Sequence, residues 1–518
     1  MRMRWIAGVG VLAVALAACS GGGGSVNVGG GSGSGSGSTA SGGTGSASGT
    51  LNVAISGEPD QLDPQKTSNY NSFEVLENVF DTLVQPNASL QMEPALATSW
   101  TTSKNQLTWT FTLRKTTWQD GTPFTSADVV YSYDRIINQK LDNAYEFAQV
   151  KSVTADGPQK VVITLTQPSP SLLAQIGGFK GVAIVEKKNV ESGQIAQHPV
   201  GTGPYKVVSW NHGSSITLAA NPHYWGGAPK IATINYTFVS DPTVALQDLE
   251  GGEVQWTDNL PPQEVQSLQR SADGFTVKSV PSTDYWYLTL NEARKPYNDV
   301  RVRQAIADAI NRAAITKAAT FGNATVNETA IPKTSQWYYD YSPYSTNLSK
   351  AKALLAQAGV KSLTMDMMVT SEYPQTVSAA QVIAAELQPL GITVKIRTLD
   401  FGTWLAEEGK GDFDSFILGW LGNIDPDDYY YAQQHTGGSF NFQKFSNPTV
   451  DKLLDQARTT TNVAQRESLY DQAAKIIVDQ ASYIYLYNPD VIQAYSSKLH
   501  GYTARADRAV RFATASLG

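Results

Sequence analysis

Residues 107–137 read LTWTFTLRKTTWQDGTPFTSADVVYSYDRII, and this stretch carries the clearest structural signals in the chain. In residues 107–113 the apolar side chains alternate with threonine, which predicts a β-strand with one buried face. Thr125 followed by Asp128 is typical of a capping box, and Val129 then opens the apolar face of a helix. A strand followed by an amphipathic helix favours a mixed α and β fold.

The same mixture continues along the rest of the chain. Further strands are predicted at residues 51–55, 161–166, 205–209, 392–396 and 482–487. Further helices are predicted after Asp299, over residues 348–358, from Pro448, and around residues 469–477. No repeat of 20 to 50 residues is present, which excludes a solenoid or a propeller. We therefore expect an α/β body with several lobes.

Composition narrows the class of protein. The chain has 518 residues, a net charge of −7 and no run of basic residues, so it lacks the positive surface that nucleic acids require. Its hydrophobic fraction of 41% is typical of a large globular protein, and its length suggests two to four domains. A single cysteine excludes a disulfide framework and cysteine-based zinc sites.

That cysteine lies near the N-terminus. Arg2 and Arg4 precede an apolar stretch over residues 5–18, which is too short for a membrane-spanning helix but typical of a signal peptide. The stretch ends in Leu-Ala-Ala-Cys at 16–19, which resembles the bacterial lipobox. The alternative is an ordinary secretory signal with an accidental cysteine. We expect residues 1–18 to be a signal peptide, Cys19 to be lipidated, and residues 19–50, rich in Gly and Ser, to form a tether.

Few residues in the sequence form patterns that indicate catalysis or metal binding. The five histidines are dispersed, and no GxSxG or Walker A motif is present. Acidic neighbours such as Asp427 and Asp428 could act as a general acid and base, but neighbouring acids in loops are usually solvated. We expect no metal site, no cofactor and no enzymatic activity.

Aromatic residues are abundant and form clusters at residues 285–287, 337–339 and 429–431. Adjacent side chains on a strand point to opposite faces, so one face of such a cluster can line a cleft. Packing between lobes is the alternative explanation.

Residues 109–136 (WTFTLRKTTWQDGTPFTSADVVYSYDRI) resemble the signature region of extracellular solute-binding protein family 5, which serves dipeptide, oligopeptide and nickel ABC importers. Four more stretches match in the family's order: 199–210 (PVGTGPYKVVSW), 221–229 (NPHYWGGAP), 287–312 (YLTLNEARKPYNDVRVRQAIADAINR), and 387–420, which ends in DFDSFILGW. The resemblance covers residues 51–518.

The resemblance implies an α/β fold, a two-lobe clamp like the type II periplasmic binding proteins, with an extra satellite domain. Lobe I would comprise residues 51–86, 199–282 and 479–518, the satellite domain 87–198, and lobe II 283–478. A solute would bind between the lobes and favour their closed arrangement. The implied partners are the solute, the permease and ATPase subunits of an ABC importer, and a membrane held through the lipid anchor. The protein would be an exported monomer on the outer face of the cytoplasmic membrane or in the periplasm.

The resemblance also points to the segment Trp420-Leu-Gly-Asn-Ile-Asp-Pro-Asp427. In peptide-binding relatives an Asp shortly after this Trp pairs with the α-amino group of the ligand, whereas here the third residue after Trp420 is Asn423. A neutral amide gives no countercharge to a buried ammonium. Either Asp425 takes over the contact, or the ligand is not a zwitterionic peptide; Asp425 could equally be a turn residue before Pro426. The candidate ligand-binding residues are Trp420, Asn423, Asp425, Trp286, Asn291, Tyr70 and Trp404.

These observations favour a binding lipoprotein that delivers di- or oligopeptides to an ABC importer. The first alternative keeps the clamp but binds an oligosaccharide or another neutral or chelated solute, because rings stack on sugars and Asn423 is uncharged. The second is a secreted hydrolase on the same tether.

Overall fold

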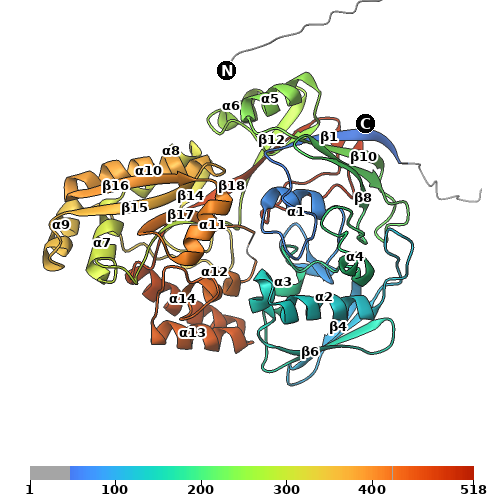
Figure 1. The fold of residues 1–518 in the computed structure, drawn as a ribbon, viewed down its shortest axis with the longest axis horizontal. Coiled ribbons are helices and arrows are strands. Elements are labelled where there is room, and N and C mark those ends of the chain that lie inside the picture. Colours follow the sequence, from blue (N-terminus) through green and yellow to red (C-terminus); the bar gives the residue numbers. More distant parts are fainter. Residues whose placement is uncertain (1–46, 423) are drawn as a thin grey trace, which may run out of the picture. The chain divides into compact units, whose positions relative to one another are not determined.

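This computed structural model describes residues 47–422 and 424–518 (Figure 1). One long strand, β18 (Tyr483–Ser496), connects the two halves of a 12-stranded sheet. Its first half pairs antiparallel with β13 (Tyr285–Leu290) and β14 (Ala324–Val326). Its second half pairs with β11 (Trp256–Thr257) and β12 (Phe275–Pro281). The expected start of the last lobe I segment at residue 479 assigns all of β18 to lobe I, whereas its first half pairs with strands expected in lobe II.

The region expected to form lobe I, and called lobe I below, is built around β1 (Ser48–Ile55), which pairs in parallel with β10 (Ile231–Phe238) and β11. The names lobe II and satellite region are used in the same way for the other expected parts. The remaining strands of lobe I are β9 (Ser215–Ala220) and β8 (Tyr205–Asn211), and its helices are α1 (Tyr70–Leu76), α5 (Pro242–Gly251) and α6 (Val265–Ser271). Leu51, Val53 and Ile55 of β1 are fully buried in its core. The predicted strands at 51–55 and 205–209 are thus confirmed.

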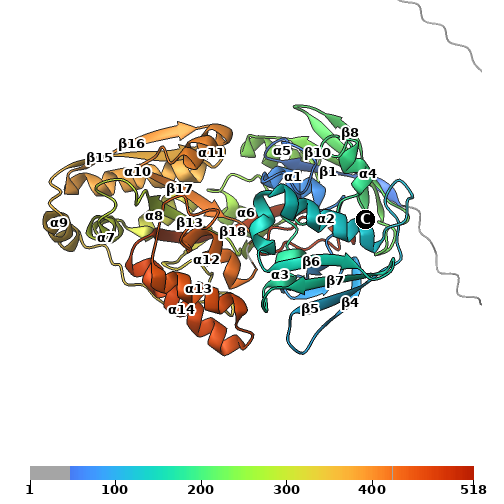
Figure 2. The same cartoon turned by 60° about the horizontal axis from the view of Figure 1, so that its bottom comes forward.

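Lobe II contains the strand order β16-β15-β17-β13-β18. All six residues of β13 are buried, because this strand lies inside the sheet and is covered on both faces. Figure 2 shows α10 and α11 beside β15 and β16, and α12, α13 and α14 on the other side of β13. The strands are β15 (Leu363–Thr370), β16 (Ile392–Leu399) and β17 (Ser415–Trp420); the helices are α7 (Val300–Ala309), α8 (Arg312–Thr320), α9 (Leu348–Gln357), α10 (Pro374–Leu387), α11 (Phe401–Lys410), α12 (Pro426–Gln434), α13 (Pro448–Thr459) and α14 (Val463–Asp479).

The helix signals in this lobe are confirmed. Asp299 is the N-cap of α7 and accepts a hydrogen bond from the backbone N–H of Arg301. Pro448 is the first residue of α13, and Gly359 follows α9 with a positive φ of 74°.

The satellite region is a four-stranded antiparallel sheet, covered by α2 (Ser126–Gln139). Its order is β4 (Ala97–Thr102), β5 (Thr108–Leu113), β7 (Lys160–Leu165) and β6 (Val150–Ala155). The capping box is present, since the backbone N–H of Thr125 donates to the Asp128 carboxylate at 2.7 Å. The smaller elements are β2 (Val84–Pro86), β3 (Met92–Pro94), η1 (Asp142–Phe147), α3 (Leu172–Gly177), α4 (Lys187–Glu191), η2 (Gln388–Leu390), β19 (Leu499–His500) and β20 (Ser516–Leu517).

The Gly-Thr-Gly-Pro sequence within the 199–210 motif is typical of a tight turn, but the two glycines serve another purpose. Gly201 and Gly203 have no positive φ. A side chain at either position would collide with the backbone carbonyl of Val79, which accepts a hydrogen bond from the Gly203 N–H at 2.9 Å. The motif therefore needs glycine for close backbone approach rather than for a left-handed turn.

No helix in residues 47–422 and 424–518 combines the length and apolar character that crossing a bilayer requires.

Candidate functional site

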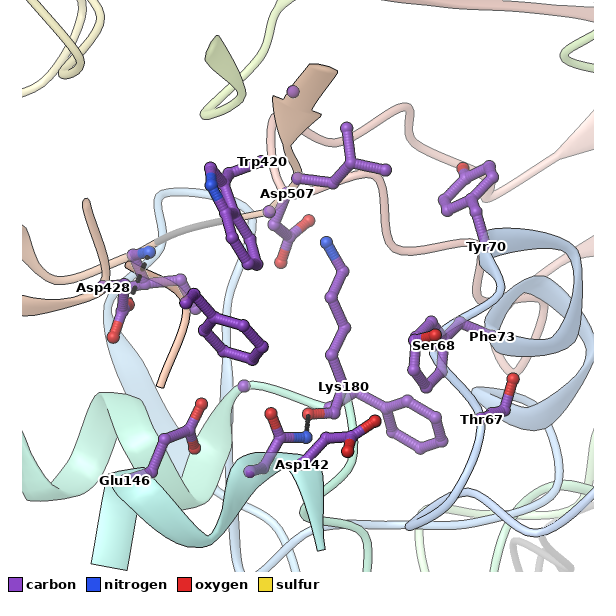
Figure 3. Close-up of a pocket in the computed structure, with 18 of the residues that line it drawn as sticks. Thr67, Ser68, Tyr70, Phe73, Asp142, Glu146, Lys180, Trp420, Asp428 and Asp507 are labelled. Atoms are coloured by element: carbon purple, nitrogen blue, oxygen red, sulfur yellow. Dashed lines mark hydrogen bonds between the residues drawn. The ribbon is translucent and has the colours of Figure 1, made fainter. Parts of the chain in front are cut away.

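A cavity of about 430 Å³ lies where lobe I, the satellite region and lobe II meet (Figure 3). This volume is within the usual range for small-molecule sites. Nine of the lining residues come from residues 142–180 of the satellite region. The aromatic lining residues are Tyr70, Phe73, Tyr145, Phe179, Trp286, Tyr373, Phe401, Trp420, Phe440 and Phe442; the charged ones are Glu77, Asp142, Glu146, Lys180, Glu408, Asp428, Asp507 and Arg511.

Aromatic rings form two walls of this cavity. The ring of Phe440 lies 4.8 Å from that of Trp420 and 5.4 Å from that of Tyr145, so it joins lobe II to the satellite region. Trp286 meets Tyr373 edge-on at 5.7 Å. Rigid rings of this kind offer broad contact area to a ligand at a small cost in side-chain entropy.

Trp420, Trp286 and Tyr70 were predicted from the sequence, and the structure brings all three to the cavity. Trp286 illustrates the alternation on β13. Its neighbours Tyr285 and Tyr287 do not line the cavity; they pack in the lobe II core, where Tyr287 stacks on Tyr483 at 3.7 Å.

Asn291 and Trp404 do not line the cavity. The Asn291 amide donates to the carbonyls of Gly411 and Phe413 at 3.2 and 3.1 Å, which fixes the loop before β17. Trp404 is fully buried and packs its ring edge-on against Phe416 at 5.0 Å. Both side chains are thus placed in the structural core of lobe II.

Asp425 is placed outside the cavity lining as well. It is the N-cap of α12, accepts from the Asp427 N–H at 2.9 Å, and receives two hydrogen bonds from the Arg466 guanidinium at 2.8 and 2.5 Å. The side chain is only 10% exposed, so its charge is already neutralised by a buried partner. Asn423 and Cys19, the other two predicted residues, lie outside the described residues.

An acidic wall is formed by Glu146 of the satellite region and Asp428 of α12. Burial raises the pKa of Asp428 to about 7, and the nearby Asp425 carboxylate adds to this rise. Burial also raises the pKa of Glu146 well above its usual value, with Asp428 as the second cause. The Tyr145 hydroxyl donates to Glu146 at 3.2 Å. This wall can hold protons near neutral pH, or exchange them for a cationic group.

Glu408 of α11 is a third unusual acid, because burial alone raises its pKa to about 8. Its side chain is 5% exposed and forms no ion pair with a described residue. Since the folded state binds this proton more tightly than the unfolded chain, Glu408 contributes stability that is fully present below pH 4 and is lost as the pH rises toward 8.

We therefore expect the Glu408→Gln variant to lose less stability between pH 5 and pH 8 than the wild type, by about 3–4 kcal/mol, because the pKa of Glu408 is about 8 in the folded state. Denaturant unfolding at a series of pH values measures this difference. The Glu250→Gln variant serves as a control and should follow the wild-type curve, because Glu250 of α5 is exposed and forms no ion pair with a described residue. Parallel curves for Glu408→Gln and the wild type would contradict the assignment.

Lys180 also lines the cavity, and Figure 3 shows its side chain extended between Trp420 and Tyr70. Its Nζ is buried and forms no hydrogen bond with any described residue. Burial lowers the pKa of Lys180, although the carboxylates of Asp284 and Glu77 oppose this effect.

Residues 142–180 could not be assigned to the site from the sequence, because no motif within them indicates a ligand. The resemblance implies a cleft between lobe I and lobe II, without residues of the satellite domain among the candidate ligand contacts. Tyr145, Glu146 and Lys180 nevertheless line the cavity, because η1 and the segment after α3 lie at its edge. In the described part of the chain, no three His, Cys, Asp or Glu side chains are grouped as metal ligands.

Comparison with known proteins identifies the family. Residues 91–441 match the model of the bacterial extracellular solute-binding proteins, family 5 (middle region). The chain belongs to this family. The fold class expected from the sequence, an α/β type II periplasmic-binding-protein fold, is confirmed by the structural relatives.

The relatives of this family 5 protein are binding proteins. The probable D,D-dipeptide-binding periplasmic protein DdpA of Escherichia coli K12 is 29% identical over 471 residues, covering 87% of this chain and 91% of its own. The structure of DppA from Helicobacter pylori, bound to the peptide STSA, is 28% identical with a TM-score of 0.83, covering 90% and 98%.

One relative was solved with a ligand that is not a peptide. The periplasmic binding protein AgaA from A. tumefaciens R10, bound to agropinic acid, is 27% identical with a TM-score of 0.83, covering 91% of this chain and 99% of its own. These relatives are transport proteins rather than enzymes.

Proposed function

We propose that this chain is the substrate-binding lipoprotein of an ABC importer and captures di- or oligopeptides between its lobes for delivery to a membrane permease with its ATPase. The observation that carries the proposal is the 430 Å³ cavity, which is lined by aromatic and charged side chains from both lobes and the satellite region. A ligand that contacts both lobes and the satellite region binds most tightly to their closed arrangement and so favours it. The permease would recognise this closed arrangement.

A peptide fits the chemistry of this cavity. Its acidic wall can hold a cationic group, Lys180 can hold an anionic one, and the rings between them suit side chains of varied shape. Two relatives support the same class: DdpA is a probable D,D-dipeptide-binding protein, and DppA was solved with the peptide STSA. The agropinic acid of AgaA supports a second candidate, a non-peptide solute in the same cavity.

Isothermal titration calorimetry against a peptide library tests the proposal on protein that has been unfolded and refolded to remove bound ligand. We expect at least one peptide to bind with micromolar affinity or tighter and with one-to-one stoichiometry. If no peptide binds more tightly than millimolar, while a non-peptide acid does, the second candidate replaces the first.

Substitution of a cavity tryptophan provides a second test. We expect Trp420→Ala to weaken binding by about 2 kcal/mol, or roughly thirtyfold, because a large buried ring contact is lost. Trp100→Ala is the matched control, since Trp100 is half-buried on β4 and does not line the cavity. Equal affinities for wild type and Trp420→Ala would place the ligand elsewhere.

We also propose that residues 1–18 are removed as a signal peptide and that Cys19 carries a lipid. The segment from Cys19 to the start of β1 at Ser48, slightly shorter than the expected 19–50, would tether the exported body to the membrane. The lone cysteine after Leu-Ala-Ala supports this proposal. Intact-mass measurement of the mature protein should show Cys19 as the first residue with added acyl chains. The Cys19→Ser variant should lose this mass and leave the membrane fraction; an unlipidated wild type would contradict the proposal.

A further inference from the structure

Lys180 is surrounded by carboxylates that already have cationic partners. Glu77 pairs with Arg511 at 3.7 Å, and Asp507 pairs with Arg505 at 2.6 Å. Asp284 pairs with Arg508. The Lys180 ammonium is therefore the cation of this group that has no ion-pair partner among the described residues.

The position of the Lys180 ammonium is set by the loop that follows β17. Gly422 has a positive φ of 63°, and a side chain at this position would collide with the Lys180 Nζ. The Gly422 N–H donates to the Asp284 carboxylate at 2.6 Å, so the loop is held in place. Lys180 thus lies against backbone on one side and faces the cavity on the other (Figure 3).

A buried ammonium without a partner is costly, and proteins rarely keep one unless a ligand completes it. We propose that Lys180 binds a carboxylate of the captured solute, so that the end of the cavity beside Gly422 selects an anionic group and rejects an ammonium. The other cation of the described lining, Arg511, is already paired with Glu77, so Lys180 offers one free positive charge there. One positive charge suits a singly charged carboxylate better than a phosphate dianion.

This inference rests on the proposed function, because it names the chemistry of the cargo in the same cavity. The carboxylate can be the C-terminus of a peptide or the acid group of a non-peptide solute. In either case, the amino group of the solute cannot lie beside Lys180 and must lie elsewhere, where Glu146, Asp428 and Glu408 offer acidic partners.

Three probe pools test the inference by thermal shift followed by calorimetry: dipeptides with a free carboxylate, the same dipeptides as C-terminal amides, and small non-peptide sugar and hydroxy acids. We expect wild-type protein to bind probes from an acid pool and to bind the matched amides at least tenfold more weakly, the usual value of a charge-assisted contact. Lys180→Met should reduce acid binding about tenfold to a hundredfold and leave amide binding unchanged.

Three further measurements separate binding from structure. Lys180→Met should be no less stable than the wild type without ligand, since no ion pair is lost; a structural lysine would lower the melting temperature. Lys180→Arg should retain part of the preference for acids. Lys188→Met is the control, because Lys188 of α4 is exposed and pairs with Asp120, and neither residue lines the cavity.

The outcomes distinguish this inference from the proposed function. Amides that bind as tightly as acids, or acids that bind equally to wild type and Lys180→Met, overturn the inference but leave a peptide-binding clamp. Non-peptide acids that bind through Lys180, without any dipeptide binding, overturn the peptide cargo and support the inference. Failure of every acid to bind overturns the inference.

Discussion

The Asp425→Ala variant is expected to lower the free energy of unfolding by about 3–5 kcal/mol, which is the usual effect of removing one partner of a buried ion pair. Arg466 donates to both carboxylate oxygens of Asp425, and each side chain of the pair is at most 10% exposed. Without Asp425, the Arg466 guanidinium stays buried without a countercharge, and α12 loses its N-cap.

A matched control separates the ion pair from the cap. Asp241 also precedes a proline at the start of a helix, α5, and accepts from the Thr243 N–H at 2.8 Å, but it is exposed and has no ion pair with a described residue. Asp241→Ala should therefore cost only about 1 kcal/mol. Urea unfolding measures both variants.

A double-mutant cycle adds a direct test of the pair. Arg466→Met should be destabilising alone, and the Asp425→Ala, Arg466→Met double variant should cost less than the sum of the two single changes. An Asp425→Ala variant that keeps wild-type stability but no longer binds ligand would instead restore Asp425 as a ligand contact.

The Asp284→Ala variant is expected to lower the free energy of unfolding by a similar amount, about 3–5 kcal/mol, and also to weaken ligand binding. Asp284 is fully buried before β13, where it pairs with Arg508 of the C-terminal segment and accepts from the Gly422 N–H. It therefore connects lobe I to the loop of lobe II that lines the cavity. Loss of this acceptor frees the Gly422 backbone beside Lys180.

The Asp284→Asn variant separates the loss of stability from the loss of ligand affinity. The amide oxygen can still accept from Gly422, so we expect ligand affinity to remain near the wild-type value, while stability falls because Arg508 loses its countercharge. Arg508→Gln combined with Asp284→Asn should recover part of the lost stability. Calorimetry and urea unfolding of the same samples give both quantities. Equal loss of affinity in Asp284→Ala and Asp284→Asn would contradict the role assigned to the Gly422 hydrogen bond.

Local signals predicted many of the elements correctly. The alternation at residues 107–113, the capping box at Thr125 and the N-cap at Asp299 are each determined by neighbours in sequence, and all three are present. For residues 285–287, period-two reasoning left a cleft wall and packing between lobes as alternatives. In the structure Trp286 lines the cavity, while Tyr285 and Tyr287 do not.

The roles of individual polar residues could not be predicted in this way. Whether Asp425 contacts ligand or caps a helix depends on Arg466, which lies 41 residues away on another helix. Asn291 similarly finds its carbonyl partners about 120 residues later in the chain. Such pairings are set by tertiary packing and leave no periodic pattern in the sequence.

Lys180 was missed for a related reason. In the sequence it is an ordinary lysine in a Gly-Gly-Phe-Lys-Gly segment, with no motif around it. Its buried ammonium can be recognised only from the structure, where it lies beside Gly422, which is 242 residues later in the sequence, and faces the cavity. The resemblance to the family points to the loop after Trp420 but does not identify the residue that faces this loop.

Native mass spectrometry of the protein purified from its own host tests the central claim, that one small solute is held in the cavity and released unchanged. We expect a one-to-one noncovalent complex in the wild type, a solute of the same mass before and after release, and clearly lower occupancy in Trp420→Ala than in Trp100→Ala. Wild-type protein that carries no solute and binds none from a host extract, or that changes the mass of the solute, would contradict the account.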